Sequence, residues 1–380
     1  MANTLTSLTP DLYEALDVVS RELVGLIPAA TLDSNVERAA VGQSVRSFVA
    51  PTSTSSNITP GVTAPDDGDQ VIGNVEVQIT KAKAVPFRWN GEEQRGMNSG
   101  PGYRNIQRDQ IAQAMRTLVN EIEADAASEY IRTSRAYGTA GTTPFASDLS
   151  DTAQIRKILS DNGAPVNGGW NMVFDTSAGA KMRTLTQLTK ANEAADSSLL
   201  RQGVLLDVHG GSLRESAQIQ SHTKGTGTSY TSDTAGYAVG ATAITLITGS
   251  GTVLAGDVVT FAGDTNKYIV STGVAAPGVI TLAAPGLQQP IAASAVAMTI
   301  GASYTANLAF TPNAFVIATR APARPEEGDM ADDVMMITDP RSGLSFEIAL
   351  YKQYRQVRYE VSCAWGQKII KPEHACLLLG

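Results

Sequence analysis

The histidines are the first residues to consider for chemistry, because imidazole acts both as a metal ligand and as a general base near neutral pH. The sequence has three of them, His209, His222 and His374. None stands in an HExxH, HxH or Cys-His pattern with the spacing of metal ligands. We therefore expect no metal ion, no cofactor and no catalytic residue.

Motifs for phosphates and calcium are incomplete. Gly225-Thr226-Gly227 lacks the third glycine and the strand-to-helix setting of a dinucleotide-binding loop. Asp66-Asp67-Gly68-Asp69 begins like a calcium loop but lacks the later ligands and the closing glutamate. The acidic pairs Glu92-Glu93 and Asp332-Asp333 lie in polar segments, where solvated surface is the ordinary interpretation. These patterns argue against an enzyme.

The composition predicts a folded, acidic chain. Of 380 residues, 43% are hydrophobic and 17% charged, with a formal net charge of −8. Binding phosphates needs clustered Lys and Arg, so any nucleic acid is expected to be enclosed without specific binding. Cys363 and Cys376 are too few for a disulfide framework, and the first residues show no secretory signal. We expect a cytoplasmic protein.

The longest uncharged stretch, Tyr268 to Thr319, raises the question of a membrane. Pro277, Pro285 and Pro290 interrupt it, and polar residues are scattered through it. A spanning helix needs about 20 continuous apolar residues. We expect uncharged β-structure here and no membrane partner.

The first element that the sequence predicts is an acidic helix. Thr9 can cap it, Pro10 suits its first position, and Leu12, Leu16, Val19 and Leu23 recur at helical spacing. Such an arm packs on its own body or binds a partner.

Residues 44–90 predict an extended hairpin. Ser44–Ala50 alternates apolar and polar residues, a Pro-, Ser- and Gly-rich connection follows, and Val71–Val85 alternates again. An isolated two-stranded ribbon is marginal in water, so it needs support from elsewhere.

Arg104–Arg135 predicts the longest helix, because it has no Gly or Pro and carries one apolar stripe. The stripe is Ile111, Met115, Leu118 and Ile122, continued weakly by Ala126 and Tyr130. A long helix with one such stripe is typical of a brace laid across a sheet.

The rest of the chain predicts α/β structure interrupted by a β-rich insertion. Helices are expected at Thr152–Asn162 and Ser177–Leu188, and a buried strand at Trp170–Asp175. Five short strands, separated by Gly- and Pro-containing turns, favour a small antiparallel barrel or sandwich. They are Ile244–Ile247, Val258–Phe261, Tyr268–Ser271, Val279–Leu282 and Val296–Ile300.

This order of elements resembles that of tailed-phage major capsid proteins of the HK97 fold, with an N-arm, an E-loop, a spine helix, a peripheral domain and an axial domain. The β insertion resembles the P22-type coat proteins, which carry an additional six-stranded barrel in the axial domain. The residues that carry this second resemblance are Gly203–Ser216, Gly256–Phe261 and Asn307–Phe315. By order of elements, the resemblance covers nearly the whole chain.

The resemblance implies an α+β, HK97-like capsid fold with an inserted antiparallel β domain. It divides the chain into an N-terminal arm (1–43), an E-loop hairpin (44–95), a spine helix with peripheral domain (96–150), a first axial part (151–227), an inserted β-barrel domain (228–303), a second axial part (304–340) and peripheral strands (341–380).

The function it implies is that of a structural subunit, which self-assembles into hexamers and pentamers of an icosahedral capsid around the double-stranded phage DNA. A scaffolding protein would assist assembly in the host cytoplasm, and a portal would occupy one vertex of the virion. Asp11, Glu14 and Asp17 are the candidate contacts for a basic scaffolding protein.

Phe48, Phe87 and Trp89 are the candidate intersubunit contacts, because aromatic side chains often dominate interfaces. Packing at the base of the hairpin is an equal alternative for all three.

Two other functions remain open. An encapsulin-like shell would keep the fold and change the contents. An extracellular β-rich adhesin or carbohydrate-binding protein would rest on residues 225–306, although the long helix and the absent signal argue against it.

Overall fold

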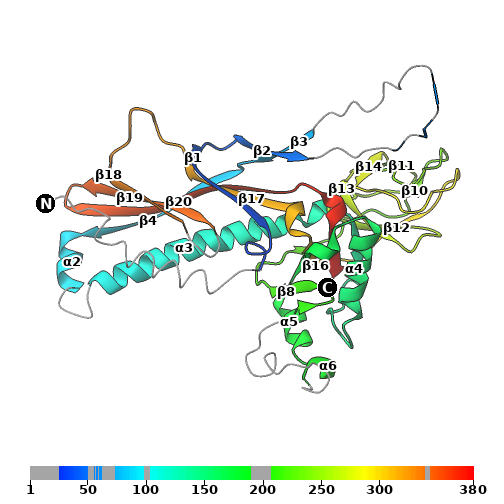
Figure 1. Ribbon diagram of the computed structural model, residues 1–380, viewed down its shortest axis with the longest axis horizontal. Coiled ribbons are helices and arrows are strands. Elements are labelled where there is room, and N and C mark those ends of the chain that lie inside the picture. Colours follow the sequence, from blue (N-terminus) through cyan, green and yellow to red (C-terminus); the bar gives the residue numbers. More distant parts are fainter. Residues whose placement is uncertain are drawn as a thin grey trace.

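The computed structural model of the protein describes residues 25–49, 55, 57–58, 60–61, 73–97, 103–189, 207–338 and 343–380. Within them, a long helix lies along a six-stranded sheet, a second sheet continues into a barrel, and a two-stranded ribbon leaves the body (Figure 1). The fold is a mixture of few helices and extensive sheets.

The six-stranded sheet joins segments that are far apart in the sequence. Its order is β1-β17-β20-β19-β18, and β4 pairs with β20 as well. Only β1 and β17 run parallel; the other pairs in this sheet are antiparallel. The strands are β1 Thr31–Ala39, β4 Lys81–Asn90, β17 Phe315–Pro322, β18 Ala331–Thr338, β19 Ser345–Gln353 and β20 Gln356–Ile369.

Helix α3, Tyr103–Ser128, braces this sheet. Its 26 residues span about 39 Å at the usual rise per residue. Ile111, Met115, Leu118 and Ile122 are at most 1% exposed and share one core with Trp365 of β20. The predicted stripe and its bracing role are confirmed.

The helix ends earlier than the sequence predicts. A 3₁₀ turn, η2 (Glu129–Arg132), follows it directly. The Thr133 hydroxyl donates to the Tyr130 carbonyl oxygen at 2.7 Å, a side-chain bond that competes with continued helix. The chain then enters β5, Arg135–Tyr137, which pairs with two strands of the second sheet.

The body of the second sheet has the order β5-β21-β16-β6-β8-β7, with β9 paired to β16. Its strands are β6 Trp170–Phe174, β7 Asp207–Val208, β8 Gly211–Glu215, β9 Ser221–His222, β16 Tyr304–Phe310 and β21 Ala375–Leu379. The shorter helical segments are α2 Gly91–Met97, α4 Ser150–Asp161, η3 Val166–Gly168, α5 Thr176–Met182, α6 Thr186–Thr189, η4 Pro312–Ala314 and η5 Pro372–His374.

One predicted helix is split. In place of a continuous helix over Ser177–Leu188, α5 ends at Met182 and α6 begins at Thr186. The Thr184 hydroxyl donates to the Lys181 carbonyl oxygen at 2.7 Å and ends the first helix locally.

The β-rich segment forms a barrel with its own core. Its order is β10-β11-β14-β13-β12-β15, and backbone bonds from Met298 to Tyr230 and from Ser232 to Val296 close the circle. The strands are β10 Thr231–Ser232, β11 Ala243–Ile247, β12 Val258–Phe261, β13 Lys267–Thr272, β14 Val279–Leu282 and β15 Met298–Ile300. The five predicted strands are confirmed. Because β13 also pairs with β5, the barrel continues the body sheet.

The predicted hairpin is confirmed only in part. Strand β2, Ser44–Val49, pairs with β3, Gly73–Gln78, as a two-stranded ribbon. The chain then continues into β4, which belongs to the six-stranded sheet. Val77 and Ile79 are buried against this sheet, so the foot of the ribbon has a core.

Candidate assembly surfaces

The three histidines lie apart, and two of them bond side chains of the fold. The Nδ1 atom of His209 lies 2.8 Å from the Thr152 hydroxyl. His222 bonds Tyr130 through Nδ1, at 2.8 Å, and Asp257 through Nε2, at 2.9 Å. Burial lowers the pKa of His374, which lies in η5. Among the residues described, no group of three or more His, Cys, Asp or Glu side chains is arranged to hold a metal ion.

The contact between His222 and Asp257 joins the barrel to the body. Asp257, which is 0% exposed, precedes β12 and accepts the backbone N–H groups of Gly225 and Leu254 at 2.9 and 2.7 Å. Tyr130 comes from η2, the turn that follows the long helix. One hydrogen-bonded chain thus links η2, β9 and the barrel.

Sequence reasoning missed this joint. Asp257 is one of few charged residues in an otherwise uncharged segment, and that isolation is a signal of a structural role.

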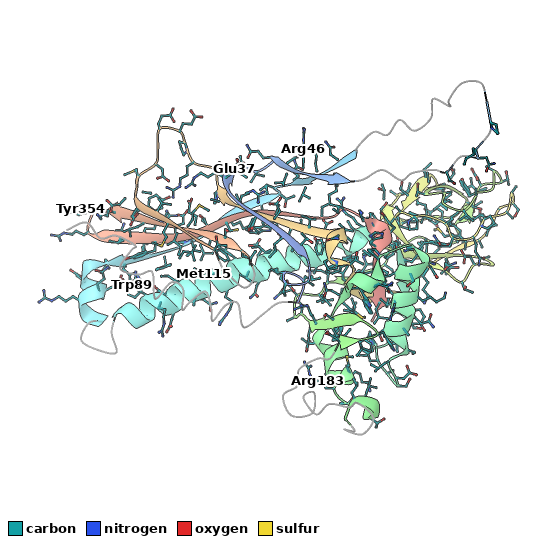
Figure 2. All side chains as sticks on the ribbon, in the orientation of Figure 1. Glu37, Arg46, Trp89, Met115, Arg183 and Tyr354 are labelled. Atoms are coloured by element: carbon teal, nitrogen blue, oxygen red, sulfur yellow. The ribbon has the colours of Figure 1, made fainter. Side chains whose placement is uncertain are left out.

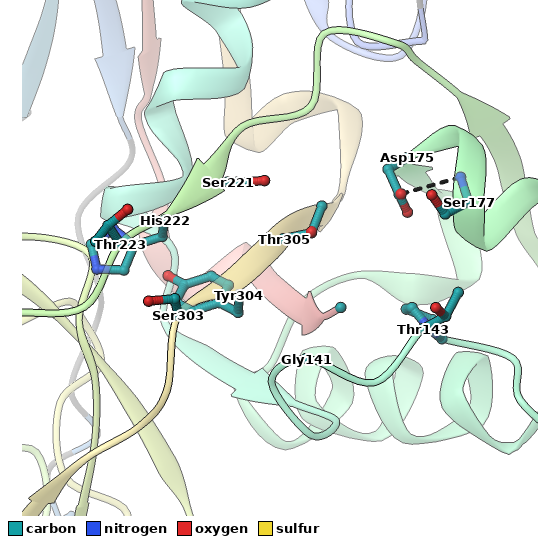
Figure 3. A pocket seen from close by; sticks show the side chains of 12 residues that line it. Gly141, Thr143, Asp175, Ser177, Ser221, His222, Thr223, Ser303, Tyr304 and Thr305 are labelled. Carbon is teal, nitrogen blue, oxygen red and sulfur yellow. Dashed lines mark hydrogen bonds between the residues drawn. The ribbon is translucent and has the colours of Figure 1, made fainter.

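A cavity of about 380 Å³ lies beside this joint (Figure 3). Its ionisable side chains are engaged in the fold. The Asp175 carboxylate caps α5 by accepting the N–H groups of Ser177 and Ala178. The Tyr304 hydroxyl donates to the Gly256 carbonyl oxygen at 2.6 Å, and burial raises its pKa well above the usual range. The arrangement holds two parts of the chain together.

The β2–β3 ribbon lies beside the six-stranded sheet as a separate pair of strands (Figure 1). Arg46 and Glu76 face each other across it with an N–O distance of 3.2 Å, and both side chains are largely exposed. Ile58, in the connection between the two strands, is 98% exposed. The outer part of the ribbon therefore offers polar and apolar groups to a partner.

The predicted aromatic contacts have different positions. Trp89 is 7% exposed, lies in the main core and donates its Nε1 hydrogen to Gln110 at 2.8 Å (Figure 2). Phe87 is half-buried and stacks on Tyr359 with the ring centroids 5.3 Å apart. The backbone of Phe48 pairs with Asn74 in the ribbon, while its side chain lies outside the described part.

The packing of Phe87 and Trp89 within the subunit matches the alternative of packing at the hairpin base. The intersubunit role of the three aromatic residues stays a prediction. Asp11, Glu14 and Asp17 lie outside the described residues, and their contact with a scaffolding protein stays a prediction as well.

Two exposed apolar side chains were missed by the sequence analysis. Met330, between β17 and β18, is 84% exposed, and Tyr354, between β19 and β20, is 88% exposed. Figure 2 places Tyr354 at the end of the sheet farthest from the barrel. The left-handed φ of 57° at Arg355 marks a tight turn there. An aromatic residue beside such a turn is the signal that could have found it.

No protein-family model matches the chain, and neither does any curated protein. Among solved structures, a chain from the capsid of the cyanophage P-SCSP1u is similar over 92% of this chain and 86% of that chain, at 12% identity and a TM-score of 0.48. A capsid chain of a native GTA particle is similar over 94% and 91%, at 12% identity and a TM-score of 0.47. A chain of a virus-like particle from Pyrococcus furiosus is similar over 97% of both, at 12% identity and a TM-score of 0.43.

No helix in the described part of the chain is long and apolar enough to cross a bilayer.

Proposed function

We propose that this chain is the repeating subunit of a closed icosahedral shell, the major capsid protein of a tailed bacteriophage. The observation that carries the proposal is the β2–β3 ribbon. Its foot is fixed in the core by Val77 and Ile79, while Ile58, in the connection between its two strands, is exposed. Because a two-stranded ribbon is marginal in water, a second copy of the chain is the partner that completes it.

The exposed apolar side chains support the same proposal. Ile58, Met330 and Tyr354 lie in three different connections between strands and are exposed. Contacts between unlike surfaces of identical subunits generate rings and closed assemblies, and many weak contacts sum to a stable shell.

We also propose a more specific type of capsid protein and its partners. The subunit has the HK97-like fold of the P22-type branch, with residues 228–303 as its inserted domain, and assembles into hexamers and pentamers with a portal at one vertex. A scaffolding protein binds the N-terminal arm in the host cytoplasm. The shell encloses double-stranded DNA in the virion without specific binding, which suits a net charge of −8.

The test is negative-stain microscopy of the purified full chain, expressed with and without its candidate scaffolding protein. Closed uniform shells, or a series of aberrant shell-like forms without the scaffold, are the expected result. A homogeneous small oligomer under every assembly condition would contradict the proposal.

The contents of purified particles distinguish the phage capsid from an encapsulin-like shell. We expect particles from infected cells to protect double-stranded DNA from nuclease. Particles that hold a packaged enzyme and no DNA would support the encapsulin-like alternative.

A further inference from the structure

Helix α3 buries a glutamate that no cation balances within the described residues. Glu123 is 0% exposed. Its Oε1 atom accepts the backbone N–H groups of Gly25 and Leu26 at 2.7 and 2.8 Å, and its Oε2 atom accepts that of Ile27 at 3.0 Å. The Ser216 side chain also favours the ionised carboxylate and so opposes the rise of the pKa of Glu123. One carboxylate thus binds three consecutive backbone amides from a segment almost 100 residues away in sequence.

The bound turn is built to fit this place. A Cβ atom on Gly25 would lie 2.5 Å from Cγ1 of Val173, so the close approach requires glycine. Leu26 and Ile27 are both 0% exposed and belong to the main core. The Asn171 side chain donates to the Ala29 carbonyl oxygen at 2.9 Å.

Strand β1 begins two residues after Ala29 and crosses the sheet in parallel with β17. The turn therefore fixes where the chain enters the body.

Charged side chains on β8 and on α3 itself are engaged with other partners. On β8, Glu215 pairs with Arg183 at 2.5 Å. On α3, Asp125 pairs with Lys81 at 2.7 Å, and Glu121 also lies within reach of Lys81, at 3.5 Å. The groups that face Glu123 are neutral donors. Burial raises the pKa of Glu123 above its ordinary value of 4.5, although each of these donors opposes the shift.

We propose that Glu123 is a proton-controlled positioning residue: its carboxylate holds the turn at Gly25–Ile27 and so sets where the N-terminal segment leaves the body, and protonation frees those amides. The consequence for assembly rests on the proposed function, because a shell subunit must hold its terminal segment in a defined direction towards its partners. The contact itself does not depend on that function.

Protonation of Glu123 changes how many hydrogen bonds its carboxyl group can accept. The ionised carboxylate offers acceptor oxygens only, whereas the neutral acid carries one O–H donor in place of an acceptor. One of the two oxygens then faces an N–H group with a hydrogen of its own. The buried side chains of Leu26 and Ile27 keep the turn close to the core, so the effect is loosening of its backbone bonds without departure of the segment.

The direction in which stability changes with pH distinguishes the loosening of this turn from global unfolding. A carboxyl group with a raised pKa in the folded state binds its proton more tightly there than in the unfolded chain. The stability that this group contributes is fully present below its pKa in the unfolded chain and is lost as pH rises through its pKa in the folded state. Acidification to the pKa of the folded state therefore does not make Glu123 destabilise the whole fold. It does weaken the three N–H contacts.

Hydrogen exchange of the full chain, followed by mass spectrometry between pH 4 and pH 8, tests the proposal. Rates are corrected for the intrinsic effect of pH on exchange. We expect the protection of the amides at 25–27 to fall at least about tenfold on acidification, with a midpoint above 4.5, while the amides of β20 stay protected. The Glu123→Gln variant should show low protection at 25–27 at every pH, because its amide carries donors of its own.

Glu121→Gln is the matched control, since Glu121 lies half a turn away and takes part in a surface ion pair. It should keep the profile of the unchanged protein. If Glu123→Gln does not fold, Gly25→Ala, which displaces the turn and leaves the carboxylate in place, should lower protection at 25–27 at neutral pH. The proposal is overturned if protection at 25–27 is the same at pH 4 and pH 8, or if Glu123→Gln retains the pH profile. Neither outcome bears on whether shells form, which microscopy of the same samples reports separately.

Discussion

The barrel and the ribbon are both built from short antiparallel strands, but the barrel is a closed sheet and the ribbon is an open one. The barrel closes on itself through the bonds between Met298 and Tyr230 and encloses its own core. Among the described residues, the ribbon pairs only β2 with β3 and has a core at its foot. A closed sheet needs no partner, whereas an open ribbon presents its edges to one. The barrel is therefore expected to determine subunit stability, and the outer ribbon to determine assembly.

The largest effect is expected inside the barrel. Phe261, which is 2% exposed, packs in the barrel core, and Phe261→Ala should lower the free energy of unfolding by about 3–5 kcal/mol because it leaves a cavity. Urea denaturation of the subunit measures it. Val279→Ala is the control, because Val279 is 53% exposed on the same barrel and its truncation should change little.

The joint between barrel and body comes next. Asp257→Ala removes the acceptor of two backbone N–H groups and of His222, and should cost about 2–4 kcal/mol. In a double-mutant cycle with His222→Ala, the two losses should be less than additive, because both remove the same bond. Strict additivity would mean that the joint does not act as one network. Asp233→Ala, at a partly exposed turn of the barrel, should have little effect.

Alkaline pH tests how much buried Tyr268 contributes to the stability of the barrel. Burial, together with the hydrogen bond to Asp264, raises the pKa of Tyr268 to about 12 from its ordinary value of 10.0. The unfolded chain ionises first, so the stability that Tyr268 contributes is complete below pH 10 and falls as pH rises to about 12, by an amount on the order of 1–2 kcal/mol after solvent screening. Unfolding measured in urea across that range should show the loss. Tyr268→Phe should reduce it by this amount, while buried Tyr304, whose pKa is raised as well, keeps its own share.

The smallest effect on the subunit is expected at the end of the ribbon. Ile58→Ser should change subunit stability by less than about 0.5 kcal/mol, because the side chain is 98% exposed. It should weaken each contact between copies by about 1 kcal/mol, roughly fivefold, and so lower the yield of shells.

Sedimentation of assembled material measures that yield. Val239→Ser, at a position 61% exposed on the barrel segment, is the matched control. A loss of stability without a loss of shells in Ile58→Ser would reverse the roles assigned to ribbon and barrel.

The parts of the fold that local sequence determines were predictable. The stripe of Ile111, Met115 and Leu118 specified the bracing helix, and turns containing Gly and Pro separated the barrel strands. Strand patterns left a barrel and a sandwich both open, because closure depends on pairing between strands far apart in the chain. The pairing of β4 with β20 was not predictable for the same reason, and it places Trp89 in the main core.

The buried carboxylates Glu123 and Asp257 were missed for the same reason. Glu123 lies beside Ile122 on the buried side of the helix, and its helical position could have marked it as unusual. Its partners at 25–27 carry no side-chain signal of a carboxylate site, because they bind through backbone N–H groups. Sequence reasoning therefore recovers strands and helices here better than the contacts that join them.

Single-particle cryo-electron microscopy of the material assembled by the full chain tests the roles of ribbon and barrel most directly. We predict a closed shell in which the β2–β3 ribbon of one subunit lies against a second copy while the barrel keeps its closed core. A particle whose ribbons contact only their own subunit, or an assembly that never closes, would contradict this prediction.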